Sequence, residues 1–487
     1  MKSIYLRTLL AASIVAASVS ANAHEDARGM QITTKSPRAH ALFEKGMHKI
    51  EILHLEDGVR SLRGAAKADP KFALAHIFIT FFSQDPAEQM GEREKAVATR
   101  KFAGPEEKLI IDWLANANQA HWIPAIQAMN EALQSYPNDK HLQWLAGWWL
   151  ALNQNQNLRA LAHFERAIKL DPGFADPWNE AAYCYAKAGN FEKAFADIKR
   201  YTELVPNEPN PQDSFAELSR MAGRFDDALT HYHMSLKIDP TFHESQLGLG
   251  DTYALMGNQS KAREEYALAI KQGTSIQAAT WSLQSAATYI REGDFAGADK
   301  AFREAAQLAH NNDFANLESE AYRTMSMYQA DSAPALELLQ KAEAVLHEDH
   351  KVPQVLLSEE MAFVLRTRVE RALHDGNQDL ANVSLKQLGE LAGASADGMV
   401  EAAYHGATGS NMLVQGIYEE AVSNFEDDEA NPISMRGLAE AYEKSGRKEN
   451  AERAAKKLAA FNIPIIEQAM VVPQFRKDQA SKLAATK

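Results

Sequence analysis

Few residues of this 487-residue sequence are placed for catalysis. It contains no G-x-S-x-G, no Walker-type phosphate loop and no G-x-G-x-x-G motif. Its single cysteine, Cys184, lies between Tyr183 and Tyr185, in a setting typical of a small buried side chain. A catalytic thiol needs a histidine and an electropositive environment, and the sequence supplies neither here. We therefore predict a protein that is not an enzyme, with no cofactor and no metal site.

The first 23 residues read as a secretory signal peptide. Lys2 and Arg7 give a positive start, residues 9–19 are uncharged and largely apolar, and Ala21-Asn22-Ala23 matches the A-x-A cleavage pattern. The apolar stretch is much shorter than the roughly 20 residues of a membrane-spanning helix. We predict cleavage after Ala23, a periplasmic or secreted protein, and no membrane insertion after cleavage.

Cleavage at that point would make His24 the first residue of the mature chain. A terminal amine and an imidazole together can chelate copper, so a copper-dependent enzyme that uses His24 is a remote alternative. The flanking residues, HEDARGMQ, instead have the composition of a flexible leader.

A tryptophan cluster is the most conspicuous candidate for binding. Trp144 and Trp148 are four residues apart and share one face of a predicted helix. Aromatic side chains are frequent anchors of protein interfaces, and in a carbohydrate-binding protein they would form a platform for sugar rings. Packing inside the core is the other interpretation, because residues 153–157 make an atypical loop.

The charge balance excludes some classes of partner. The chain has 51 Lys and Arg against 65 Asp and Glu, a formal net charge of −14. Nucleic-acid phosphates and anionic lipid surfaces both attract proteins rich in Lys and Arg. We therefore expect no nucleic acid and no lipid surface among the partners.

The elements that would position these residues recur every 34 residues. Glycines at 189, 223 and 257 keep this step, and so do alanines at 160, 194, 228 and 262, each followed four residues later by a bulky apolar or aromatic residue. Residues 177–189 and 191–204 both show apolar residues at helical spacing, separated by Gly189 and ended by Pro206. Each unit is therefore predicted to be a pair of helices.

These landmarks resemble the tetratricopeptide repeat, whose pattern is W-x2-L-G-x2-Y, then A-x3-F, then P. One unit carries it at Trp178, Ala181, Ala182, Tyr185, Ala194, Ile198 and Pro206, and a later unit at Leu249, Gly250, Tyr253, Ala262 and Tyr266. The resemblance implies an all-α solenoid of about twelve helical pairs whose first helices line a concave surface. It also implies protein or peptide partners.

The repeat register assigns a set of candidate partner-binding residues to the concave face. They are Trp144, Trp148, Asn179, Tyr183, Lys187, Asp213, Glu217 and Arg220. Polar residues of mixed sign suit a peptide, and they are equally compatible with a solvated helix face.

The chain divides, on these patterns, into seven segments. They are a signal peptide (1–23), a flexible leader (24–37), N-terminal helical pairs (38–140), a regular array (141–310), irregular pairs (311–395), C-terminal repeats (396–472) and a polar tail (473–487). We predict an exported scaffold that binds protein or peptide partners through its concave face. The alternative is a cell-wall- or carbohydrate-binding accessory protein that stimulates an envelope enzyme.

Overall fold

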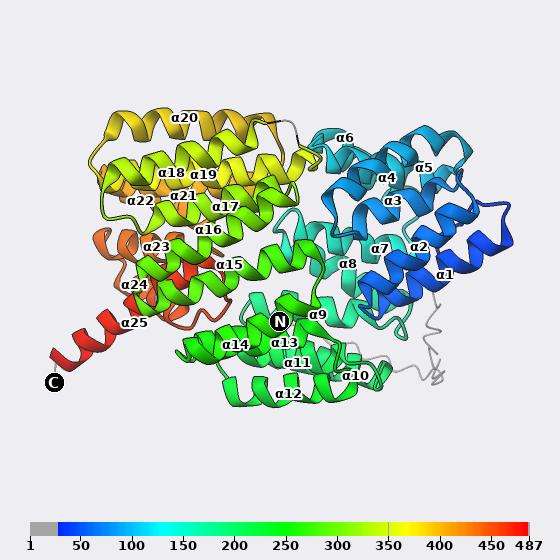
Figure 1. Cartoon of the computed structure of the whole chain (residues 1–487), viewed down its shortest axis with the longest axis horizontal. Coiled ribbons are helices and arrows are strands. Elements are labelled where there is room, and N and C mark those ends of the chain that lie inside the picture. Colours follow the sequence, from blue (N-terminus) through cyan, green and yellow to red (C-terminus); the bar gives the residue numbers. More distant parts are fainter. Residues whose placement is uncertain (1–27, 349, 486–487) are drawn as a thin grey trace, which may run out of the picture.

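The computed structural model describes residues 28–348 and 350–485, and this part of the chain folds into 25 α-helices and one short 3-10 helix. It contains no β-strand within those residues, only a single bridge between Arg28 and Asp139. The signal peptide and His24 lie outside the described residues. Figure 1 shows the helices stacked in chain order from α1 to α25.

The helices form twelve antiparallel pairs followed by one last helix, within the described residues. The first six pairs are α1 (Pro37–Glu51) and α2 (Leu55–Ala68), α3 (Ala73–Phe82) and α4 (Pro86–Thr99), α5 (Pro105–Asn118) and α6 (Trp122–Ser135), α7 (Lys140–Leu152) and α8 (Asn157–Leu170), α9 (Asp176–Lys187) and α10 (Phe191–Leu204), α11 (Asn210–Met221) and α12 (Phe225–Ile238). The 3-10 helix, Arg100–Phe102, follows α4.

The other six pairs are α13 (His243–Leu255) and α14 (Gln259–Gln272), α15 (Ser275–Glu292) and α16 (Phe295–Asn311), α17 (Ala315–Met327) and α18 (Ser332–Leu346), α19 (Gln354–His374) and α20 (Gln378–Ala394), α21 (Gly398–Val414) and α22 (Tyr418–Glu426), α23 (Pro432–Lys444) and α24 (Lys448–Ala459). The chain ends on α25 (Ile466–Ala485). The predicted all-α solenoid of about twelve pairs is confirmed.

The glycines and alanines that recur every 34 residues lie where their spacing predicted, at the turns and at the close contacts between helices. The glycines at 189, 223 and 257 have φ values of 78°, 75° and 89°, in the left-handed region that a turn between paired helices needs. The alanines at 160, 194, 228 and 262 are fully buried. Each lets two helices approach closely, and the bulky residue four positions later fills the space between neighbouring pairs.

Close helix packing also explains two glycines inside α13. A methyl group at Gly248 would lie 2.2 Å from the Tyr232 ring, and one at Gly250 would lie 2.7 Å from the Tyr266 ring. Both rings are almost fully buried. Tyr232 on the preceding second helix and Tyr266 on the second helix of the same pair therefore leave no room for a side chain at these two positions of α13.

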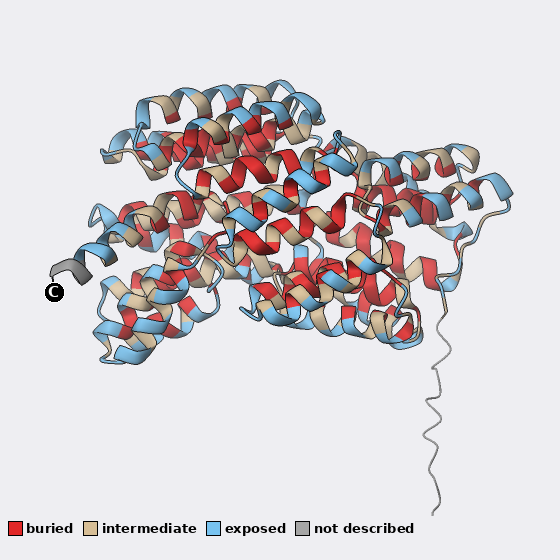
Figure 2. Ribbon diagram, turned by 90° about the horizontal axis from the view of Figure 1, so that it is seen from below, coloured by how far each residue is buried: buried red, intermediate tan, exposed pale blue. Residues whose placement is uncertain are grey.

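The irregular spacing between residues 311 and 395 reflects longer helices. α19 has 21 residues and α20 has 17, against 12 and 14 for α9 and α10. The extra turns shift the landmarks without changing the pairing. Figure 2 shows that, across the solenoid, buried residues gather on the sides of the helices that are turned toward other helices.

Both ends of the described chain differ from the expected leader and tail. The Arg28 guanidinium lies 2.6 Å from the Glu106 carboxylate, and the Thr33 N–H donates to Glu107, so residues 28–36 pack on α5 instead of forming a flexible leader. The tail expected after Pro473 is the second half of α25. Burial of Val471 and Val472 against α23 and α24 holds this helix together in spite of its internal proline.

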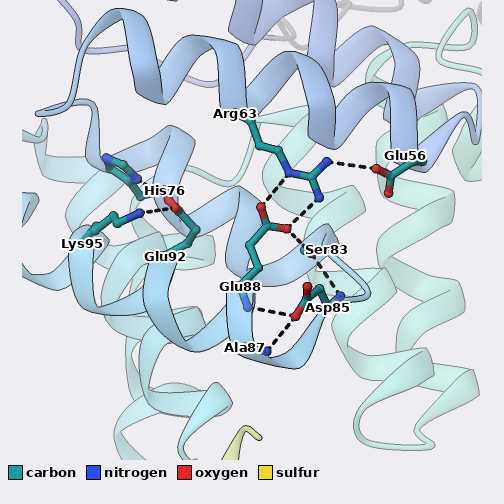
Figure 3. Close-up of polar contacts among 9 residues, drawn as sticks. All are labelled: Glu56, Arg63, His76, Ser83, Asp85, Ala87, Glu88, Glu92 and Lys95. Carbon is teal, nitrogen blue, oxygen red and sulfur yellow. Dashed lines mark hydrogen bonds and ion pairs between the residues drawn. The ribbon is translucent and has the colours of Figure 1, made fainter. Parts of the chain in front are cut away.

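An ion-pair network fixes the second pair onto the first. Figure 3 shows Arg63 of α2 between Glu56 and Glu88, with its Nε 2.6 Å from Glu88 and its Nη1 2.9 Å from Glu56. Ser83 donates a second hydrogen bond to Glu88, and Asp85 caps α4. The pKa of Glu88 is lowered, because these hydrogen bonds outweigh the opposing effect of its burial. The network sets the position of α4 relative to α2 and α3.

Candidate partner-binding groove

The first helices of successive pairs form the inner side of the solenoid. From α7 onward each first helix contacts the next one, whereas successive second helices are farther apart. Side chains that point from one first helix to the next therefore lie on the concave side. The predicted site residues lie on α7, α9 and α11, three of these helices.

The two tryptophans are part of the core. Trp144 is fully buried and Trp148 is 8% exposed, so neither offers an open aromatic face to a groove. Both indole N–H groups donate to the same carboxylate oxygen of Asp176, at 2.8 Å from Trp148. The packing interpretation of Trp144 therefore describes this structure, and an anchor role on the groove surface does not.

The other candidates on α9 and α11 form an internal polar network. The Tyr183 hydroxyl donates to Glu217 at 2.9 Å, and Arg220 lies between Glu217 and Asp251, 2.8 Å from each. Tyr266 donates to the second oxygen of Asp251 at 2.7 Å. The network runs across three successive repeats, which ties their first helices together.

Asn179, Lys187 and Asp213 have separate partners. The Asn179 amide is buried and donates to Glu180 at 3.1 Å, and Lys187 donates to Asn157 on α8 at 3.2 Å. Asp213 is buried and accepts the Ser245 hydroxyl at 2.6 Å. Burial raises the pKa of Asp213 to about 8 and that of Glu180 to about 7. Asn179 and Asp213 are therefore desolvated, whereas Lys187 is exposed.

A hollow lined by later first helices lies farther along the chain. A pocket of about 460 Å³ opens between the first helices α17, α19, α21 and α23, and α25 forms one of its walls. Its apolar lining comes from Phe363, Leu413, Val414, Ile433, Met470 and Val471. Pockets of this size with mixed lining are typical ligand sites.

The charged groups of this pocket are mostly neutralised by the protein. Arg323 pairs with Glu360 at 2.7 Å, and Arg366 pairs with Asp428 at 2.8 Å, all four side chains being buried. Arg436 differs, because it is exposed and makes no hydrogen bond or ion pair with any residue that the structure describes. The Arg436 guanidinium is therefore available to pair with an anionic group of a ligand.

Acidic groups also belong to this lining. Glu370 accepts the Ser410 hydroxyl at 2.6 Å, and its pKa is raised by burial, an effect that the nearby Arg366 and Arg436 reduce. Glu440 is exposed. The pocket thus offers a cation, two carboxyl groups and an apolar floor.

The beginning of α25 closes one end of this pocket. Gln468 accepts a hydrogen bond from Arg291 of α15, and Glu467 lies 3.8 Å from Arg323 of α17. Ile466 and Ala469 pack into the core of α15 and α16. Figure 1 shows the other end of α25 extending away from the body.

No motif of the sequence marks this pocket. Its lining residues are divided between the irregular segment 311–395 and the C-terminal repeats, and α25 reaches helices more than 170 residues earlier in the chain. The irregular spacing of residues 311–395 was the one available signal, because departures from a repeat often accompany a functional surface.

Two searches of the described residues gave negative results. No group of three or more His, Cys, Asp or Glu side chains there is arranged to hold a metal ion. None of the helices in residues 28–485 combines the length and apolar composition that crossing a bilayer requires.

Comparisons with known proteins point to one repeat family. Residues 145–209 match the family model described as the tetratricopeptide repeat. Superkiller protein 3 of Schizosaccharomyces pombe is 21% identical over 223 residues, and superkiller complex protein 3 of Mus musculus is 24% identical over 114 residues. These matches cover 44% and 23% of this chain but only 16% and 7% of those relatives.

A solved structure with the same type of fold is the Cut9 and Hcn1 assembly of the APC/C. It is 14% identical, covers 86% of this chain and 76% of that chain, and has a TM-score of 0.42. The assignment of the repeat type rests on the match of residues 145–209 to the family model, and that of the fold on the twelve helical pairs of the described residues. Residues 145–209 are therefore a tetratricopeptide-repeat segment, and the described chain around it has the all-α solenoid fold.

Proposed function

We propose that this protein is an exported, non-enzymatic scaffold that binds a protein or peptide partner in the pocket between α17, α19, α21, α23 and α25. The observation that supports it most directly is Arg436, an exposed cation beside an apolar floor on the concave side. The repeat fold supports the class of partner, since such solenoids present extended concave binding surfaces.

The lining indicates the chemistry of the partner. Leu413, Val414 and Ile433 would accept apolar side chains, and Val414 is 61% exposed. Arg436 would pair with a carboxylate of the partner, and Glu370 and Glu440 would reject a second acidic group nearby. We therefore propose a segment with apolar residues and one well-placed carboxylate.

Charge reversal at Arg436 tests this proposal. The partner should be recovered from the cell envelope with the wild-type protein and lost, by at least tenfold, from Arg436→Glu, because attraction becomes repulsion. The control is Arg453→Glu, which reverses an exposed arginine on α24, the second helix of the same pair. Quantitative mass spectrometry of the captured proteins gives the ratio, and circular dichroism verifies folding.

Two results would contradict the pocket as the binding site. Equal recovery of partners by wild type and Arg436→Glu would place the interface elsewhere on the solenoid. Equal loss from both charge-reversal variants would show a general effect of net charge on recovery and not a contact in the pocket.

Export carries its own prediction. The pattern of residues 1–23 supports removal of this segment, so the purified mature protein should begin at His24 and have 464 residues, obtained as 487 less 23. Intact-mass measurement of protein from its own cells checks this. A chain that retains Met1 would exclude cleavage, and a different first residue would remove the copper alternative at His24.

A further inference from the structure

The chain's own residues 461–472 lie against several first helices of the solenoid. Asn462 donates to the carbonyl of Met221 at the end of α11, a contact between residues 241 positions apart. Ile466 packs into the core of α15 and α16, and Val472 packs on α23 and α24. Because first helices form the inner side, this segment occupies part of the surface that a partner would contact.

The composition of the 461–472 segment matches the chemistry proposed for the partner. Nine of its twelve residues are apolar, and Glu467 is its only charged residue. The first five residues have no regular structure, and the rest begin α25. Glu467, Met470 and Val471 line the pocket proposed for the partner. The segment therefore already places apolar side chains and one carboxylate at that pocket.

The polar contacts that hold this segment are weak. The Glu467 carboxylate is 3.8 Å from Arg323, whose guanidinium already pairs with Glu360 at 2.7 Å. The Asn462 amide is 3.5 Å from the Met221 carbonyl, which is long for a hydrogen bond. Burial of apolar side chains therefore provides most of the attachment, and another apolar segment can provide the same burial.

Arg291 of α15 has a neutral partner where it could have an acidic one. Its guanidinium donates to the Gln468 amide, and it forms no ion pair in the described part of the chain. Burial lowers the pKa of Arg291 to about 10, so the side chain is still charged at pH 7. A carboxylate in place of the Gln468 amide would add an ion pair. Arg291 does not line the pocket, so this carboxylate would be separate from the one that pairs with Arg436.

We propose that the 461–472 segment occupies the partner's place, and that an apolar partner segment with an acidic residue at the position of Gln468 displaces it and pairs with Arg291. The inference rests on the proposed function, because the segment forms one wall of the proposed pocket. It makes binding a competition, in which the attachment of the chain's own segment lowers the apparent affinity for the partner.

The test uses the full mature protein and a synthetic peptide. The peptide has the sequence of residues 461–472 with the change Gln468→Glu, is blocked at both ends and carries a fluorescein label. We expect saturable binding by fluorescence anisotropy. Hydrogen exchange of residues 466–472 of the protein should become at least threefold faster when the peptide is bound, because the chain's own segment is released. A peptide of the same composition in scrambled order is the control and should leave the exchange unchanged.

Variants of the protein's own segment give an order of affinities for this peptide. Gln468→Ala removes the hydrogen bond to Arg291 and should bind the peptide at least threefold more tightly than wild type. Gln468→Glu supplies the missing carboxylate and should bind it at least threefold more weakly. Gln474→Glu makes the same charge change at an exposed position of α25 and should bind as wild type does. Circular dichroism verifies folding, and the exchange measurement on wild type needs no variant.

Three outcomes would overturn this inference. They are the absence of saturable peptide binding, unchanged exchange of residues 466–472 in the presence of bound peptide, and equal affinity of wild type, Gln468→Ala and Gln468→Glu. Each would make the segment a permanent part of the fold. The pocket itself is tested separately by partner capture with Arg436→Glu, so loss of the partner from that variant together with any of these outcomes would reject the competition and retain the proposed function.

Discussion

Replacing Arg323 by methionine should lower the free energy of unfolding by about 3–5 kcal/mol, because it removes one partner of a buried ion pair. Its guanidinium lies 2.7 Å from Glu360, and the two side chains are 6% and 7% exposed. Glu320 and Glu467 each lie 3.8 Å away. Without the Arg323 guanidinium, the carboxyl groups of Glu320, Glu360 and Glu467 would lie close together with no cation between them. The loss of unfolding free energy should therefore exceed that of an ordinary surface substitution. Urea unfolding at pH 7, followed by circular dichroism, measures it.

A second substitution, at the ion-pair partner Glu360, tests whether an unpaired buried charge causes the loss of stability. Adding Glu360→Gln to Arg323→Met should recover part of the loss, since burial already raises the pKa of Glu360 to about 7 and glutamine carries no charge. Arg303→Met is the control, because Arg303 is exposed on α16 and should change stability by less than about 0.5 kcal/mol. A variant Arg323→Met as stable as wild type would show that the pair adds nothing to the fold.

The repeat fold could be predicted because its determinants are local. Ala194 and Ile198 are buried, and Gly189 is left-handed, for reasons that apply within one pair of helices and its neighbour. A period of 34 residues repeats these short-range requirements, so the sequence displays them directly. Gly416 and Gly446 in the C-terminal repeats also have positive φ, because the same short-range requirement applies to the turns there.

The candidate site could be predicted only in part. The repeat register indicates toward which side of the solenoid a side chain points, but not whether that side chain is accessible to a partner. Asp213, Glu217 and Arg220 contact side chains of neighbouring first helices. Trp144 does not reach a surface: it is fully buried, and its indole N–H donates to Asp176 at the start of the next first helix. Whether a position on the inner side is open depends on the helix that follows it.

The repeat pattern could not predict contacts between residues that are far apart in the sequence. His54 lies 2.7 Å from Glu208, and Asn462 donates to the carbonyl of Met221. These contacts arise because the solenoid turns back on itself, and the pitch of a superhelix is the sum of many small rotations between pairs. The position of α25 against α15 has the same origin, so the pocket that it closes could not be located from local spacing.

Replacing Asp213 by asparagine should make the protein more stable than wild type as pH rises. Burial, with Glu217 and Glu244 nearby, raises the pKa of this carboxyl to about 8, an effect that Ser245 and Arg220 only partly oppose. A folded pKa above the unfolded value means that the folded state binds the proton more tightly. The stabilising contribution of that proton is complete at low pH and is lost as pH rises toward 8.

Asparagine keeps the shape of Asp213 and can still accept the Ser245 hydroxyl, but it has no proton to lose. The difference in unfolding free energy between Asp213→Asn and wild type should therefore increase from pH 5 to pH 8, by at most about 1.4 kcal/mol per pH unit. Urea unfolding at four pH values measures this slope, and Glu192→Gln, which removes an exposed carboxylate of α10, should show almost none. A pH-independent difference for Asp213→Asn would mean that Asp213 is solvated in solution, and the inner face between α9 and α13 would then be open to a partner.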